Sequence, residues 1–267
     1  MIELLSQGFM VRALAAGLII GSLCAILSVV VVLKKMSFMG AGISHSAFGG
    51  VALGALLGTD FMYSALGFSV FAALCIAWMS RRGGIHEDTG VGVMFAASMA
   101  FGVLCLGLAK GYNIDLFAFL FGSILAVSEA DLILAMGALI ITAALMMVFY
   151  KEIKVYCFDE EWAKVSGVNV ERLQDMLLVM IAVAVVVSIK LLGIVLVSAL
   201  LVIPGAVGYM LASTYKSQYM ISLACAVISV ICGLVLSYHF DIASGATIVL
   251  SATALFGLTA IVAPARG

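Results

Sequence analysis

The chain has 267 residues, of which 65% are hydrophobic and 10% are charged, and its formal net charge is −1. A typical soluble domain is about 45–50% apolar and about 25% charged. The 13 basic and 14 acidic residues of this chain therefore cannot cover a water-soluble surface. The composition excludes a soluble enzyme, a nucleic-acid-binding protein and a disordered chain. It predicts a polytopic membrane protein with one transmembrane domain over residues 1–267, surrounded by lipid.

The apolar segments are long and unbroken, which favours membrane-spanning helices over the alternating strands of a barrel. In chain order, crossings are expected at residues 8–33, 37–57, 63–79, 90–109, 132–150, 173–189, 192–212, 219–238 and 243–263. A further apolar segment, residues 116–127, would be about 18 Å long as a helix, too short for a hydrocarbon core of about 30 Å. We therefore expect an all-α fold of eight to nine transmembrane helices with one short re-entrant segment.

Most basic residues fall on one side of this nine-span arrangement. They are Lys34, Lys35, Arg81, Arg82, Lys151, Lys154, Lys164, Arg172, Lys216 and Arg266. The other side receives Arg12, Lys110 and Lys190. By the positive-inside rule, the N-terminus is expected outside the cell and the C-terminus in the cytoplasm.

The most polar part of the chain is the predicted cytoplasmic loop of residues 151–175. It contains a short run with acids at its start and glycine just past its end: Asp159, Glu160, Glu161, Trp162, Ala163 and Gly167. Acids at the start and glycine after the end predict one short helix outside the bilayer. This helix is either a solvated connector or a docking site for a cytoplasmic partner.

His45 lies well inside the second predicted span. Ionisable groups within membrane spans are costly and are candidates for function, and imidazole suits zinc and related transition metals. The alternative is a packing histidine that is hydrogen-bonded to Ser44 or to a carbonyl group. The same span carries glycine at every fourth position, which predicts tight packing on a neighbouring helix: Gly50, Gly54 and Gly58.

His239 and Asp241 lie at the outer end of the eighth predicted span. They can share a cation only if the helix has ended there, as the following Gly245 suggests. The alternative is a pair of interfacial residues that contact water. A third polar group, residues 86–88, lies at the start of the fourth span, where acids at a helix N-terminus need no ligand to explain them.

Motifs for ATP binding and for thiolate chemistry are missing from the sequence. No G-x-x-x-x-G-K-[ST] loop occurs, so the chain carries no Walker motif. No C-x-x-C pair occurs among the six cysteines, which argues against a thiolate metal site or a disulfide framework. We expect no enzymatic activity and no bound cofactor, and any ATP-driven step must use another polypeptide.

Several short segments follow one another from residue 34 to the last span. In order they are KMS (35–37), ISHS (43–46), GVALG (50–54), DTGVG (88–92), LFGSIL (120–125), KLLG (190–193), SALLVIP (198–204) and FD (240–241). In this order they resemble the membrane permeases of bacterial ABC importers for zinc, manganese and iron, the ABC-3 family.

The resemblance implies a homodimeric permease in the bacterial plasma membrane. It also implies two copies of a separate ATPase and an extracytoplasmic metal-binding protein that delivers the ion. The segment from Asp159 to Gly167 stands where such permeases present a coupling helix to the ATPase. His45 and Asp241 fall at positions that resemble those lining the family's metal path.

One position departs from the family pattern. Members usually have an aspartate four residues before the histidine, and this chain has Ala41. Positions four apart share one helix face, so a carboxylate ligand beside His45 is missing. Manganese favours such oxygen ligands, and His239 would add nitrogen character. We therefore expect the transported divalent ion to be zinc first, with manganese or iron next.

Two other functions stay open at this point. A permease for a metal chelate, siderophore or vitamin would need a wider pore, which composition alone does not exclude. A secondary carrier without partners would need buried carboxylates for proton or sodium coupling, and the predicted spans contain almost none.

Overall fold

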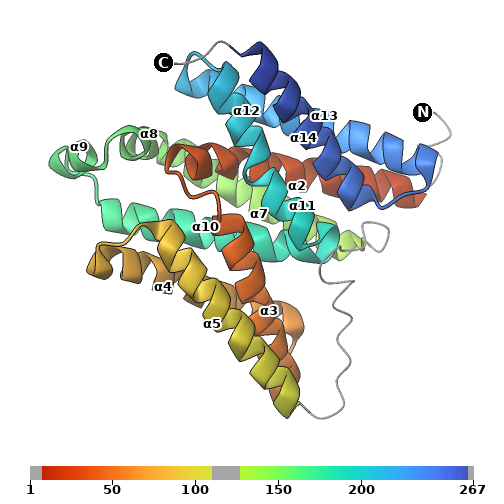
Figure 1. Cartoon of the computed structure of the whole chain (residues 1–267), viewed down its shortest axis with the longest axis horizontal. Helices are drawn as coiled ribbons and strands as arrows, with labels where there is room; N and C mark the ends of the chain where they lie inside the picture. Colours follow the sequence, from red (N-terminus) through yellow and green to blue (C-terminus); the bar gives the residue numbers. More distant parts are fainter. Residues whose placement is uncertain (1–7, 110–126, 264–267) are drawn as a thin grey trace.

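The computed structural model describes residues 8–109 and 127–263 (Figure 1). This described part is helical and contains no strand. Nine helical segments in it are long and apolar enough to cross a membrane, which agrees with the predicted number. The predicted re-entrant segment, residues 116–127, lies outside the described residues except for its last position.

Four long helices make up the described N-terminal part of the chain. They are α2 (Gly8–Leu33), α3 (Met39–Leu57), α4 (Phe61–Gly83) and α5 (Glu87–Leu108). Asp60 caps the start of helix α4, because its carboxylate accepts hydrogen bonds from the backbone N–H groups of Met62 and Tyr63. Gly84 caps the end of α4 with φ 58°, a left-handed conformation that glycine adopts without strain.

The remaining described helices include both long spans and short pieces. They are α7 (Glu129–Val148), α8 (Tyr150–Phe158), α9 (Glu160–Val165), α10 (Val170–Leu192), α11 (Ile194–Leu200), α12 (Ile203–Leu211), α13 (Tyr215–Phe240) and α14 (Ser244–Val262). Two predictions need correction here. The polar loop expected at residues 151–175 is mostly helical, because it holds α8, α9 and the start of α10. The span expected at residues 192–212 is broken near Val202, since Pro204 lacks the N–H group that would continue the helix.

Helices α2 and α10 form the centre of the molecule, between two groups of helices (Figure 1). On one side α3 packs against α4 and α5, and α4 also packs against α10. On the other side α13 packs against α14, α12 and α2. Helix α7 contacts both central helices. The two central spans are consequently the most buried of the long helices, together with α3.

Glycines allow α3 to approach both of its neighbours closely. A Cβ atom on Gly50 would lie 2.6 Å from the carbonyl oxygen of Ser64 in α4, and one on Gly49 would lie 2.9 Å from the carbonyl oxygen of Ser98 in α5. The predicted tight packing is therefore confirmed for Gly50 and for Gly54, where a Cβ atom would lie 2.9 Å from the Ser64 hydroxyl oxygen. Gly58 serves another purpose, because it ends α3 with φ 68° and a Cβ there would meet open space.

Candidate functional site

His45 lies on the only partly exposed stripe in the first half of α3. From residue 41 to residue 50, Ala41 and His45 are partly exposed and the other positions are buried. The imidazole ring packs edge-on against Phe95 of α5, with ring centroids 4.6 Å apart. The expected alternative, a hydrogen bond to Ser44, is absent within the described residues, where the Ser44 hydroxyl is buried and unpartnered. His45 is therefore held by packing and leaves part of its surface accessible.

His239 and Asp241 lie where α13 ends, and both are exposed. His239 belongs to the last helical turn, whereas Asp241 follows the helix with φ 52°, a left-handed conformation. Left-handed backbone costs roughly 1–2 kcal/mol for most residues, although aspartate tolerates it better than most. A carboxylate at this end of a helix also faces the negative pole of the helix dipole. A cation near Asp241 would relieve this repulsion.

The chain does not bring these three residues together into one group. Helix α3 packs among α4, α5, α10 and α11, whereas α13 packs among α2, α12 and α14. Within the described residues, no cluster of three or more His, Cys, Asp or Glu side chains could hold a metal ion. His45 and the pair His239 and Asp241 are thus two separate groups of possible ligands in a single chain.

The short helix expected near residue 160 is confirmed as α9. The Asp159 carboxylate accepts a hydrogen bond of 2.9 Å from the backbone N–H of Trp162, which caps the helix start. Gly167 ends the helix with φ 83°, and the N–H of Val168 then donates to the carbonyl of Ala163. The local sequence therefore determines both ends of α9.

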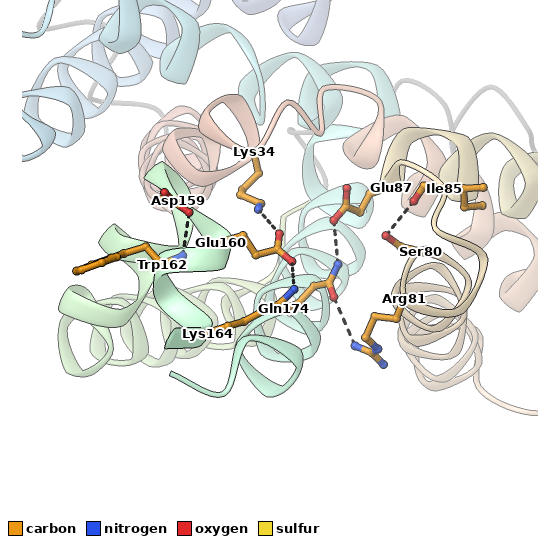
Figure 2. Close-up of polar contacts among 10 residues, drawn as sticks. All are labelled: Lys34, Ser80, Arg81, Ile85, Glu87, Asp159, Glu160, Trp162, Lys164 and Gln174. Carbon is orange, nitrogen blue, oxygen red and sulfur yellow. Dashed lines mark hydrogen bonds and ion pairs between the residues drawn. The ribbon is translucent and has the colours of Figure 1, made fainter. Parts of the chain in front are cut away.

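The residues proposed for docking lie on two different faces of α9. Ala163 is fully buried, and Glu160 points toward the bundle. The Trp162 side chain is 63% exposed and points away from the neighbouring polar residues in Figure 2. Val165 and the preceding Phe158 are also exposed. Two large apolar side chains of α9, and one from the end of α8, are thus presented to the surroundings.

Glu160 anchors α9 to the end of α2 (Figure 2). Its carboxylate accepts a hydrogen bond of 2.9 Å from the Lys34 ammonium group and forms an ion pair of 3.1 Å with Lys164. Lys34 also lies over the ring of Tyr156, 3.8 Å from its centroid. Burial alone raises the pKa of Glu160, but the hydrogen bonds from the two lysines outweigh burial and hold the pKa below its ordinary value.

A second polar chain joins α4, α5 and α10 beside α9. Gln174 donates to Glu87 at 2.9 Å, and Arg81 pairs with Asp175 at 2.6 Å. A hollow of about 380 Å³ lies between these polar side chains and α9, and Glu160 and Lys164 line its wall on the α9 side. The sequence explained Glu87 only as an acid at a helix start. In the structure Glu87 also joins α5 to α10 through its hydrogen bond with Gln174. Its pairing with Gln174 has no local sequence signal, because the two residues lie 87 positions apart.

At the other end of the bundle, Lys190 and Asp131 form an ion pair of 2.6 Å between α10 and α7. Asp131 also belongs to a capping box with Ser128 at the start of α7. In the part of the chain that the structure describes, nine apolar helical segments, with ionisable side chains gathered near the helix ends, define a multi-pass membrane protein.

Comparison with known proteins identifies the family. A model of the ABC 3 transport family matches residues 6–263. The manganese transport system membrane protein MntC of Halalkalibacterium halodurans is 32% identical over 265 residues, covering 99% of this chain and 91% of that protein. The probable iron transport system membrane protein of Haemophilus influenzae is 32% identical over 256 residues, covering 96% and 94% respectively.

A solved structure gives the same result at the level of the fold. PsaBC from Streptococcus pneumoniae in complex with Fab matches with a TM-score of 0.85 and 32% identity, covering 98% of this chain and 94% of that chain. The chain belongs to the ABC-3 transport family.

Proposed function

We propose that this chain is the membrane permease of an ATP-binding-cassette importer that carries manganese into the cytoplasm. The observation that carries the proposal is the 32% identity to a manganese transport system membrane protein over 99% of the chain. Iron is the second candidate, because a relative of equal identity is named as a probable iron transport protein.

The relatives do not support the expected preference for zinc. That preference rested on Ala41, which removes one carboxylate beside His45. The residues beside His45 on α3 do not define the full set of metal ligands. Asp241, at the end of α13, can supply a hard oxygen ligand, and such ligands suit manganese. Manganese therefore replaces zinc as the proposed cargo, with His45, Asp241 and His239 as the proposed ligands along the path.

The proposed assembly contains a second copy of this chain, two ATPase subunits and an extracytoplasmic metal-binding protein. The absence of a Walker motif supports a separate ATPase. The exposed apolar side chains of α9, above all Trp162, support α9 as the ATPase-docking helix, since exposed aromatic residues are typical anchors of interfaces. The separation of His45 from Asp241 within one chain supports a path that a second copy helps to enclose.

The proposed orientation places α9 in the cytoplasm and the N-terminus outside. It is supported by the positions of Lys34 and Arg81 near α9 and of Lys164 within it (Figure 2). With this orientation, the binding protein would meet the end of the bundle that carries Lys190 and Asp131.

Reconstitution tests the proposal directly. The chain would be purified with its ATPase, placed in liposomes with the binding protein, and supplied with manganese, iron or zinc. We expect ATP-dependent uptake of manganese that exceeds uptake of zinc at equal free concentration. Uptake without ATP and without the ATPase would instead indicate a secondary carrier. Uptake of a chelate in preference to the free ions would indicate a chelate permease.

A further inference from the structure

We propose that Lys34 is a positioning residue that transmits the movement of α9 to α3, the helix that carries His45. The inference rests on the proposed function, in which α9 is the helix that the ATPase moves. Its basis is the ion pair between Lys34 and Glu160, which joins the docking helix to the turn between α2 and α3.

The Lys34 ammonium group is held from two sides. It donates to the Glu160 carboxylate at 2.9 Å and lies 3.8 Å from the centroid of the Tyr156 ring. The Lys34 side chain is 13% exposed, the Glu160 side chain is 39% exposed, and Tyr156 is fully buried. The lysine end of the pair is thus shielded from water and held by two partners, whereas the glutamate end keeps contact with water. The contact is therefore specific enough to pass on a displacement of α9.

Few other contacts restrain α9. It packs mainly against α8 and α10, its neighbours in the sequence. On the side facing α4 and α5 it borders the hollow of about 380 Å³ rather than a packed surface. Figure 2 shows Lys34 reaching Glu160 from the end of α2, and Gln174 and Arg81 also line the hollow. The hollow leaves room for α9 to shift toward α4 and α5. Such a shift would move Lys34 through its ion pair with Glu160.

The turn after Lys34 is short and rigid. Lys35 adopts φ 57°, a strained conformation for a residue other than glycine, and the N–H of Met36 donates to the carbonyl of Val31 at 2.8 Å. Met36 is buried, so the turn is fixed to the end of α2. Helix α3 begins at Met39, directly after this turn. A displacement of Lys34 would therefore also displace the start of α3, because the connecting turn is short and fixed.

The test uses the complete complex in liposomes and measures metal uptake and ATP hydrolysis in the same sample. Lys34→Met removes the charge and keeps the length of the side chain. Lys35→Met is the matched control, because Lys35 is the adjacent lysine and its side chain is exposed. Lys34→Arg keeps the charge, and the double variant Lys34→Glu with Glu160→Lys reverses the pair.

We expect Lys34→Met to lower the metal transported per ATP by about tenfold, within the range of coupling between two sites, while the ATPase stays bound and active. Lys34→Arg should keep most of the coupling, and Lys35→Met should leave it unchanged. The reversed pair should recover only part of it, because a carboxylate at position 34 loses the contact with the Tyr156 ring and a lysine at position 160 repels Lys164. An unchanged transport ratio in Lys34→Met would overturn the proposal. Loss of the ATPase from Lys34→Met would also overturn it, because Lys34 would then act in docking.

The variant Trp162→Glu separates this inference from the proposed function. If the ATPase stays bound to Trp162→Glu, the proposed docking role of α9 is wrong. The proposed role of Lys34 is then wrong too, because it depends on that docking. If the ATPase is lost from Trp162→Glu and Lys34→Met is normal, only the role of Lys34 is wrong.

Discussion

Ala41 and His45 lie one helical turn apart on the same partly exposed stripe of α3, between positions that are buried. The side chain at position 41 is therefore placed to act together with the imidazole. This relationship makes position 41 a site at which ion preference can be changed by one substitution.

Ala41→Asp should favour manganese. The new carboxylate would stand beside His45 and add a hard oxygen ligand. We expect the manganese concentration for half-maximal uptake to fall severalfold, with a smaller effect for zinc. Ala41→Asn is the matched control of similar size without the charge. Equal responses to both ions, measured by competition in the uptake assay, would contradict a ligand role for this stripe.

Trp162→Glu should release the ATPase without unfolding the permease. Trp162 is 63% exposed and contributes little to the core, so its replacement removes an anchor rather than a packing contact. Trp162→Phe should retain most of the binding. Copurification of the ATPase, together with size-exclusion chromatography of the permease, measures both effects. A complex of Trp162→Glu that is as stable as the natural one would count against α9 as the docking helix.

Gly50→Ala should destabilise the fold by about 1–3 kcal/mol, the usual cost of overpacking. The added methyl group would lie 2.6 Å from the Ser64 carbonyl oxygen, and backbone cannot move aside cheaply. Gly67→Ala in α4 is the control, because a Cβ there meets open space. We expect a lower midpoint of thermal unfolding for the first variant and no decrease for the second. Similar midpoints would show that α3 and α4 are less closely packed.

Acid should loosen α9. The pKa of Glu160 lies below its ordinary value of 4.5, so its ionic contacts stabilise the fold fully above that value and are lost as the pH falls through the lower folded value. In a Trp78→Phe background, the fluorescence anisotropy of Trp162 reports the mobility of α9. We expect a steady anisotropy from pH 7 to about 5 and a decrease at lower pH.

Glu160→Gln is the control for the acid experiment. Its anisotropy should be low already at neutral pH, because the neutral amide does not form the ion pair with Lys34. A pH response of the same size in Glu160→Gln would mean that another group causes the loosening.

Much of the fold follows from local sequence. The spans were predicted within a few residues because length and apolarity alone define a helix that crosses lipid. Helix α9 was predicted because Asp159 and Gly167 determine its ends locally. The break near Val202 was missed, since the apolar run continues through it and only Pro204 indicates it.

The polar contacts between helices could not be predicted. Lys34 and Glu160 lie 126 positions apart, and nothing near either residue specifies the other. In the sequence Lys34 indicated only the orientation of the chain. The candidate ligands His45 and Asp241 were found because ionisable groups near the membrane are scarce, but their separation on different helices depends on tertiary packing.

We propose that His45 and Asp241 bind the ion on its way through the permease. The most direct measurement is ATP-dependent manganese uptake by liposomes that contain the complete complex with His45→Ala, Asp241→Ala or both. We expect each single variant to lower uptake strongly and the double variant to abolish it, while ATPase binding stays normal. Uptake by the double variant at the level of the natural protein would show that these residues do not bind the ion.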